Sequence, residues 1–264
     1  MQKEETLIPK LIHLTWFSGE PFPENLQRCI DSWKKTLPDY KIMIWDMDMA
    51  RNLNIPFVNE ALDLKKWAFA GDVVRAYAVW KHGGIYMDTD VYVLKSFDDF
   101  LNQKMVFFIE LNKKEWDTYN PKGVFDSEWH CIDQNCFIRG RQIQAACFMG
   151  IKGNSCLKEI VDLYKTRHFI NSDGTPDMSV ISPSLYAKVL EKYGFVYEDK
   201  KQHLGDIVVY PSSFVALSQY ECHPNTIAVH LGAHAWEPRG PWSEIKYKIK
   251  MSPLGPFLSK LLNK

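Results

Sequence analysis

The sequence predicts an α/β domain, and three observations carry this prediction. Apolar, strand-like segments alternate with amphipathic, helix-like segments from the N-terminus onward, which is the pattern of a sheet covered by helices. Of the 264 residues, 46% are hydrophobic and 24% are charged, so the chain can bury a substantial core without disulfide bonds. No internal repeat is apparent. We therefore expect a single domain over residues 1–240.

The N-terminal part of the chain predicts a strand, a helix and a second strand. Residues 8–17 form an apolar run that ends at Ser18-Gly19. Residues 23–37 place apolar side chains on one helical face, and Pro38-Asp39 ends the helix. Residues 40–45 are again apolar. This β-α-β order is typical of the start of a nucleotide-binding α/β sheet.

A second helix, predicted over residues 68–80, precedes a strand with two carboxylates at its exit. Asp72 and Arg75 are three residues apart and fall together on the surface of this helix. His82-Gly83-Gly84 ends the helix. The strand then begins at Ile85, runs through Asp88-Thr89-Asp90 and continues to Val93. Carboxylates beside a buried strand require a partner or a function.

The rest of the chain is less regular. A long segment of mixed composition, residues 110–141, fits a functional loop or a disordered insertion. Beyond it we expect a strand at 144–150, helices at 154–167 and 183–193, and short strands at 207–210 and 227–231.

The charge balance and the aromatic content narrow the classes of partner. Lys and Arg number 32 and so do Asp and Glu, whereas a general nucleic-acid binder carries a basic excess, so we expect no nucleic-acid partner. Aromatic residues make up 14% of the chain and include 9 tryptophans. Most of these rings are expected in the core, but neutral charge with many rings favours a sugar or nucleotide partner.

Cysteines and apolar segments indicate the compartment. The 6 cysteines show no CxxC pair and no zinc-site spacing, which favours reduced thiols and a cytoplasmic location. We find neither a signal peptide nor an apolar run long enough to span a bilayer. Residues 241–264 have a net charge of +4 and end in an amphipathic pattern. This segment fits either peripheral contact with the inner face of the membrane or docking on its own domain.

The two carboxylates at the strand exit suggest metal chemistry. In an extended chain, Asp88 and Asp90 emerge on one face and can converge on one hard cation. Such a cation keeps positions open for phosphate oxygens and can neutralise a diphosphate leaving group. The pattern also fits haloacid-dehalogenase-type phosphatases, in which Asp88 would be a nucleophile. A complete β-α-β unit precedes the motif and no later acidic pair is evident, so the phosphatase is the alternative.

Three motifs together resemble glycosyltransferase family 32: residues 8–16, Asp72-x-x-Arg75, and Gly83-Gly84-Ile85-Tyr86-Met87-Asp88-Thr89-Asp90. This family includes capsular-polysaccharide and mannosyltransferase-like proteins and is distantly similar to the glucosyltransferase domains of large clostridial toxins. The resemblance implies a GT-A-type nucleotide-diphospho-sugar transferase fold, with a central mixed sheet flanked by helices. It also implies a sugar-nucleotide donor, Mn²⁺ or Mg²⁺, and transfer with retention of anomeric configuration.

The resemblance assigns roles to individual residues. Trp16 is similar to the aromatic residue that stacks on the nucleotide base, and its alternative role is core packing. Asp72 and Arg75 resemble the pair that holds the donor sugar and ribose hydroxyls. Asp90 matches the carboxylate that binds the cation directly, and Asp88 the one that reaches ribose, the metal and the diphosphate.

The C-terminal motif adds two candidates. His230 resembles a third metal ligand, and Trp236 a residue that contacts the diphosphate. Ala235 stands where a serine is usual and His234 where a glycine is usual, so either histidine fits as the ligand. Two further departures from the family pattern suggest altered specificity: Ala145 replaces an Asn, and Ile181-Ser182-Pro183 replaces Thr-Gly-Pro.

The expected function is that of a metal-dependent retaining hexosyltransferase. It would move a sugar from a nucleotide-diphosphate sugar to a glycan or lipid-linked saccharide in surface polysaccharide synthesis. A UDP-sugar is favoured as donor, with GDP-mannose second. Trp116, Tyr119 and Trp129 in the 110–141 segment form a candidate acceptor platform. A sugar-binding relative without turnover is a further alternative.

Overall fold

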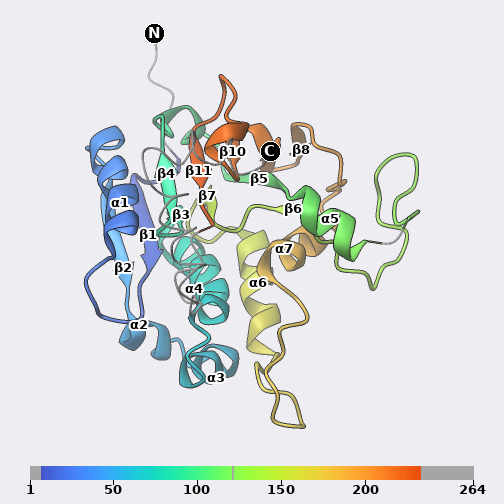
Figure 1. Cartoon of the computed structure of the whole chain (residues 1–264), viewed down its shortest axis with the longest axis horizontal. Coiled ribbons are helices and arrows are strands. Elements are labelled where there is room, and N and C mark those ends of the chain that lie inside the picture. Colours follow the sequence, from blue (N-terminus) through green and yellow to red (C-terminus); the bar gives the residue numbers. More distant parts are fainter. Residues whose placement is uncertain (1–6, 121, 233–264) are drawn as a thin grey trace, which may run out of the picture.

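The computed structural model describes residues 7–120 and 122–232, which form an α/β arrangement of two sheets and surrounding helices (Figure 1). The expected boundary at residue 240 and the basic segment 241–264 lie outside the described residues, as do His234 and Trp236.

The larger sheet has eight strands and is mixed, which confirms the predicted class. Along it the strand order is β2-β1-β3-β7-β5-β9-β8, and β6 pairs with β5. The β1–β2, β1–β3 and β5–β9 pairs are parallel, and the remaining pairs are antiparallel. The strands are β1 (Leu11–Thr15), β2 (Lys41–Trp45), β3 (Gly84–Met87), β5 (Met105–Leu111), β6 (Arg141–Ile143), β7 (Cys147–Gly150), β8 (Gln202–Leu204) and β9 (Ile207–Tyr210).

The smaller sheet corrects one expectation. It consists of β10 (Val215–Ala216), β11 (Ala228–His230) and β4 (Val91–Val93) in the order β10-β11-β4. Residues 85–93 are therefore not one continuous strand. The chain leaves the large sheet after β3 and enters the small sheet at β4, and Asp88-Thr89-Asp90 forms the connection.

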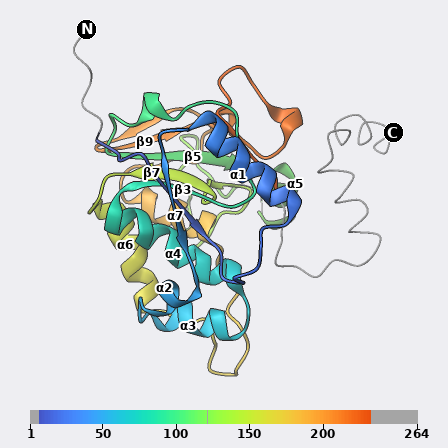
Figure 2. The same ribbon diagram turned by 90° about the vertical axis from the view of Figure 1, so that its left-hand side faces the viewer.

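Helices cover both faces of the large sheet. Figure 2 shows α1 on one side and α2, α3, α4 and α6 on the other. Apolar residues of α1 pack against β4 and the sheet in one buried cluster, and α3, α4, α6 and α7 contribute to a second cluster. The helices are α1 (Glu24–Thr36), α2 (Met47–Arg51), α3 (Pro56–Asp63), α4 (Trp67–His82), α5 (Lys113–Tyr119), α6 (Ser155–Lys165) and α7 (Ser182–Glu191), with short 3₁₀ turns η1 (Asp98–Phe100), η2 (Ser212–Phe214) and η3 (Gln219–Glu221).

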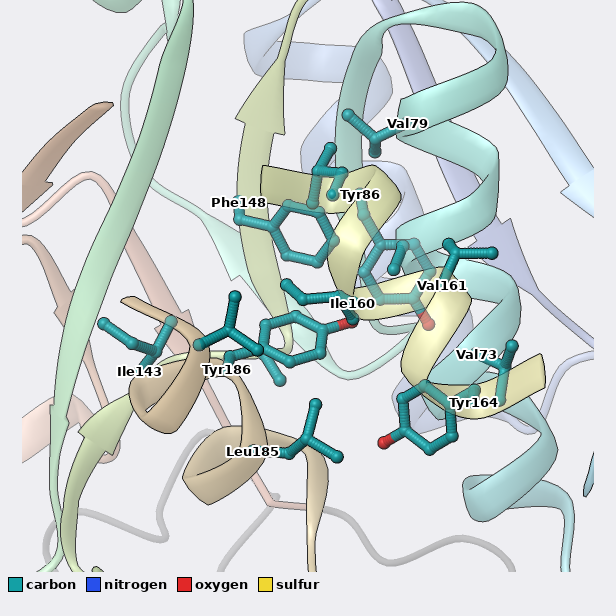
Figure 3. Close-up of a cluster of buried hydrophobic side chains, with 14 of the residues drawn as sticks. Val73, Val79, Tyr86, Ile143, Phe148, Ile160, Val161, Tyr164, Leu185 and Tyr186 are labelled. Atoms are coloured by element: carbon teal, nitrogen blue, oxygen red, sulfur yellow. The ribbon is translucent and has the colours of Figure 1, made fainter. Parts of the chain in front are cut away.

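The second cluster surrounds α4, which is buried on nearly all sides. Figure 3 shows Val73 and Val79 of this helix among side chains from β3, β7, α6 and α7. The sequence explains this position, because small and branched apolar residues occupy most of the helix and allow other elements to approach closely. Polar side chains on such a helix are consequently removed from water.

Several other elements lie where the sequence predicts them. The opening strand–helix–strand, the helices at 154–167 and 183–193, and the strands at 207–210 and 227–231 are confirmed within a few residues. All 6 cysteines are unpaired, as predicted. Within the described ranges, the helices are too short or too polar to span a bilayer.

The described residues of the 110–141 segment, 110–120 and 122–141, are folded rather than a disordered insertion. The segment begins inside β5, continues into α5 and ends at β6, and the Asn112 side chain accepts a hydrogen bond from the Glu115 N–H at the start of α5. Trp116 and Phe125 stack with ring centroids 5.4 Å apart, and Phe125 also stacks on Tyr197. The strand expected at 144–150 begins only at Cys147, because residues 144–146 form a link between β6 and β7.

Candidate active site

The site is built around the connection between the two sheets. A turn closes over residues 88–91, where the Val91 N–H donates to the Asp88 carbonyl at 3.0 Å. The expectation of an extended chain at this point is therefore wrong, and the turn is what brings the two aspartates together. Two further hydrogen bonds position the turn: the Asp88 N–H donates to the Ala146 carbonyl, and the Trp33 indole donates to the Val91 carbonyl.

His230 completes a candidate metal centre with Asp88 and Asp90. Their three ligand atoms all lie within 4.8 Å of one another. β11 pairs with β4, which places His230 opposite Val91, and His230 Nε2 lies 3.5 Å from Asp90 Oδ1. The three residues predicted as metal ligands are thus brought together by the smaller sheet.

The chemistry of this group fits a divalent cation. Two carboxylates and one imidazole suit Mn²⁺ or Mg²⁺. Burial acts to lower the pKa of His230, but the carboxylates of Asp90, Asp88 and Glu110 outweigh it and raise this pKa to about 9. His230 Nδ1 is buried and has no hydrogen-bond partner among the described residues. The excess of negative charge around this group is relieved by a bound cation.

Asp72 and Arg75 lie together on α4, as their spacing predicts, and the pair is buried inside the protein. Only 8% of Asp72 and 7% of Arg75 is exposed. The Arg75 guanidinium lies 3.2 Å from Asp72 Oδ1 and 3.5 Å from Asp88 Oδ1, so it links α4 to the metal centre. The Ser182 hydroxyl donates to Asp72 Oδ1 at 2.7 Å. Burial raises the pKa of Asp72 to about 6, although Arg75 and Ser182 act in the opposite direction.

Tyr86 is a site residue that the sequence analysis missed. Its hydroxyl donates a 2.6 Å hydrogen bond to Asp88 Oδ1 and lies 3.2 Å from the Thr15 hydroxyl. The Arg75 guanidinium lies over the Tyr86 ring, 5.1 Å from its centroid. The sequence does contain a signal for this contact. Tyr86 stands two residues before Asp88, and side chains two residues apart along a strand lie on the same face.

Glu110, at the end of β5, is the second residue that was missed. Its Oε1 accepts a 2.8 Å hydrogen bond from Gln142, whose own Oε1 accepts one from Ser184. Burial raises the pKa of Glu110, and its electrostatic partners include His230, Glu115 and Arg75. Glu110 thus adds a third carboxylate to Asp88 and Asp90 near His230.

The structure also places three other residues singled out in the sequence analysis: Trp16, Ala145 and Ser182. Trp16 directly follows β1 and is half-buried, and its indole donates to the Glu20 carbonyl at 2.6 Å. Its stacking on a base stays a prediction. Ala145 is buried, with 1% of its surface exposed. Ser182, one of the departures from the family pattern, binds Asp72 directly.

Comparison with known proteins identifies relatives of this chain. Residues 23–107 match the family described as glycosyltransferase sugar-binding region containing DXD motif. Uncharacterized glycosyltransferase L373 of Acanthamoeba polyphaga mimivirus is 30% identical over 189 residues, which are 67% of this chain and 74% of the relative. Inositol phosphoceramide mannosyltransferase 2 of Schizosaccharomyces pombe is 33% identical over 90 residues, or 33% of this chain and 26% of that protein. The chain therefore spans about a quarter of this yeast relative's length.

The chain is also similar to a solved structure. PaToxG Glycosyltransferase superposes with a TM-score of 0.46 and 18% identity, over 70% of this chain and 69% of the other. The matched family region contains Asp72, Arg75, Asp88 and Asp90, and it ends before Glu110 and His230. The extended similarity to the viral protein carries the relationship across most of the chain. The chain belongs to the DXD-containing, family 32-like glycosyltransferases.

Proposed function

We propose that the protein transfers a sugar, with retention of configuration, from a nucleotide-diphosphate sugar to a saccharide acceptor in a metal-dependent reaction. The observation that carries this proposal is the convergence of Asp88, Asp90 and His230 at one end of the buried Asp72–Arg75 pair. The two aspartates suit a divalent cation. The neighbouring Asp72–Arg75 pair offers a buried carboxylate and a guanidinium to the sugar and ribose of the donor.

Each group has a distinct role in this proposal. Asp88, Asp90 and His230 would hold Mn²⁺ or Mg²⁺, which when bound neutralises charge on the diphosphate. The Arg75 guanidinium is fixed by two carboxylates and can donate to donor oxygens, while Asp72 can accept from sugar hydroxyls. Trp16 would stack on the nucleotide base.

The transfer step exchanges one bond for another. The acceptor oxygen forms a bond to the anomeric carbon while the bond from this carbon to the diphosphate oxygen breaks. The hydroxyl proton passes to the departing diphosphate, on the same face of the sugar, so configuration is retained. Fixed charges around the departing group supply most of the stabilisation.

A UDP-sugar is the favoured donor and GDP-mannose is the second candidate. The names of the yeast relatives refer to mannosyltransferases, which supports testing mannose donors alongside the uridine series. A glycan or a lipid-linked saccharide of a surface polysaccharide is the proposed acceptor. A cytoplasmic location is supported by the 6 unpaired cysteines, and contact of residues 241–264 with the inner face of the membrane is part of the proposal.

The alternatives are less well supported. In the phosphatase interpretation Asp88 attacks a phosphoester, yet its Oδ1 accepts a hydrogen bond from Tyr86 and faces Arg75. Family membership favours glycosyl transfer. A relative that binds sugar without turnover would not need two carboxylates and an imidazole arranged around one point.

A thermal-shift screen of sugar nucleotides with Mn²⁺ tests the proposal, because a ligand that binds the folded state raises the melting temperature. We expect a shift from one nucleotide series that requires Mn²⁺ and is lost in Asp90→Asn. The matched control is Asp99→Asn, which removes an exposed carboxylate nine residues away. Release of nucleotide diphosphate from the same donor would then be measured. A shift that is independent of Mn²⁺, or one that survives in Asp90→Asn, contradicts the metal-dependent proposal.

A further inference from the structure

Unsatisfied polar atoms gather around Glu110. Among the described residues, Gln144 Nε2, His230 Nδ1 and Glu115 Oε2 are buried and have no hydrogen-bond partner. Glu115 and His230 both interact electrostatically with the Glu110 carboxylate. A buried polar group without a partner is unfavourable by about 1–3 kcal/mol, so three of them in one region indicate a place that a ligand completes.

Strand register puts Gln144 on the same side as Glu110. In the antiparallel β5–β6 pair, Glu110 stands opposite Gln142, and the Gln144 N–H continues the ladder to the Phe108 carbonyl. Ile143 points into the core cluster (Figure 3), so its neighbours Gln142 and Gln144 project from the opposite face. Gln144 is 1% exposed, and its Oε1 already accepts from the Ala146 N–H.

That face is the one covered by the smaller sheet. Phe108 packs in the same buried cluster as Ala228 of β11, and β11 ends in His230. The free Gln144 amide and the Glu110 carboxylate therefore lie toward the metal centre. Gln144 is also tied to the DXD turn, because the Ala146 carbonyl accepts the Asp88 N–H.

Glu115, the third residue with an unsatisfied atom, belongs to the 110–141 segment. α5 begins directly after β5, and Glu115 lies in its first turn, where the Asn112 side chain caps the helix. The result is a polar cluster of Glu110, Glu115 and Gln144, with His230 at its boundary. It offers carboxylate acceptors and an amide donor within the same small region.

We propose that Glu110, Glu115 and the Gln144 amide form the subsite that binds the acceptor sugar ring and holds its attacking hydroxyl toward the metal centre. This inference rests on the proposed function. Neutral sugar hydroxyls both donate and accept, so they match a mixed set of acceptors and one donor. Two carboxylates disfavour an anion, so the diphosphate of the donor belongs at the metal centre and not at this cluster.

The hydrogen bonds that hold Glu110 also determine how the attacking hydroxyl of the acceptor is oriented. Glu110 is held by the chain from Ser184 through Gln142, which leaves its other oxygen for a ligand hydroxyl. The carboxylate positions the acceptor oxygen for attack, and the hydroxyl proton still passes to the departing diphosphate. Glu110 is thus an acceptor-binding residue and not a nucleophile.

The test measures acceptor binding separately from donor binding. Methyl glycosides of glucose, galactose and mannose are titrated by calorimetry into the full-length protein, with Mn²⁺ and the nucleoside diphosphate that gives the largest thermal shift. We expect wild type to bind at least one glycoside. Glu110→Gln should weaken that binding at least tenfold, and Glu115→Gln at least threefold. Glu128→Gln, a matched change at an exposed glutamate of the same insertion, should leave it unchanged.

The nucleotide thermal shift reports whether each variant is folded and keeps its donor site. We expect this shift to persist in Glu110→Gln and Glu115→Gln. Wild-type protein that binds nucleotide but none of the glycosides would overturn the inference, as would equal glycoside binding by wild type and both variants. Loss of nucleotide and glycoside binding together in Glu110→Gln would assign Glu110 to the donor site and also overturn it. Wild type that binds no nucleotide with Mn²⁺ would instead count against the proposed function.

Discussion

The hydroxyl of Tyr86 donates a 2.6 Å hydrogen bond to Oδ1 of Asp88, from a ring that is fully buried in the core. Because Tyr86 uses its proton on Asp88, the Thr15 hydroxyl 3.2 Å away is the donor to Tyr86. Two strands of the large sheet thus orient the first carboxylate of the DXD turn.

Tyr86→Phe removes this hydrogen bond with little change in packing volume. We expect a loss of about 1 kcal/mol in unfolding free energy, typical of one hydrogen bond, and a weaker affinity for Mn²⁺ because Asp88 is no longer oriented. Urea denaturation and Mn²⁺ titration measure the two effects. Tyr92→Phe, at an exposed tyrosine of β4, is the control. Unchanged Mn²⁺ affinity in Tyr86→Phe would show that the hydrogen bond does not orient the ligand.

Ser182→Ala tests the ionisation of Asp72. The Ser182 hydroxyl stabilises the charged carboxylate, so its removal should raise the pKa of Asp72 further above about 6. If the charged form is the active one, the acidic limb of the pH–rate profile moves to higher pH, and the activity lost at pH 6.5 returns at pH 8. Ser96→Ala, at an exposed serine, should leave the profile in place. A uniform loss of activity at every pH would contradict this account.

The buried His13 ring should make the protein less stable to unfolding in acid. Its Nε2–H donates to the Gly83 carbonyl and its Nδ1 accepts from the Trp45 indole, so the buried ring is neutral. Burial lowers the pKa of His13 to about 4, and nearby His82 acts in the same direction. Below pH 6.5 the unfolded chain binds a proton that the folded protein excludes, so stability falls between pH 6.5 and 4, by roughly 3 kcal/mol at most.

His13→Gln preserves a donor and an acceptor without the titrating group. We expect its unfolding free energy to decline less than that of wild type between pH 7 and pH 4.5 in urea melts. His203→Gln, at an exposed histidine, should follow the wild-type curve. Parallel curves for wild type and His13→Gln would rule out His13 as the source of the acid sensitivity.

Gly84→Ala should prevent stable folding. Gly84 has φ = 112°, and an added Cβ would lie 2.3 Å from the Leu11 carbonyl oxygen of the adjacent strand. Neither atom can move without breaking the β1–β3 pairing, so we expect a loss of several kcal/mol. Circular dichroism and solubility of the variant check this, with Gly153→Ala as control, since its Cβ would meet nothing within 4 Å although its φ is also positive. A Gly84→Ala protein as stable as this control would be inconsistent with the close approach.

Local patterns were sufficient to predict part of the molecule. The first strand, helix and second strand follow from apolar periodicity and from proline and glycine signals close in sequence. The Asp72–Arg75 pair was found by its spacing. The elements that cover it were not, because α6 and α7 pack onto α4 from later in the chain.

Features that depend on pairing between segments far apart in the sequence were missed or wrongly predicted. The turn at 88–91 was expected to be extended, since nothing near it reveals that Val91 pairs with His230. Glu110 was placed in a loop because β5 lies between strands from other parts of the chain, and its role depends on Gln142 and His230. The sequence motifs identified the family, whereas the neighbours of Glu110 were evident only from the three-dimensional arrangement.

The position of the DXD turn between the two sheets has a mechanical consequence. An ion on Asp88, Asp90 and His230 would cross-link the exit of β3 to the end of β11. These two points are distant in sequence, and the short β4–β11 pairing connects them. Loading the centre would make the smaller sheet melt together with the larger one. Hydrogen exchange at the amides of Ala228 and Val229 would slow when Mn²⁺ is added, which makes the small sheet a reporter of occupancy even without a sugar donor.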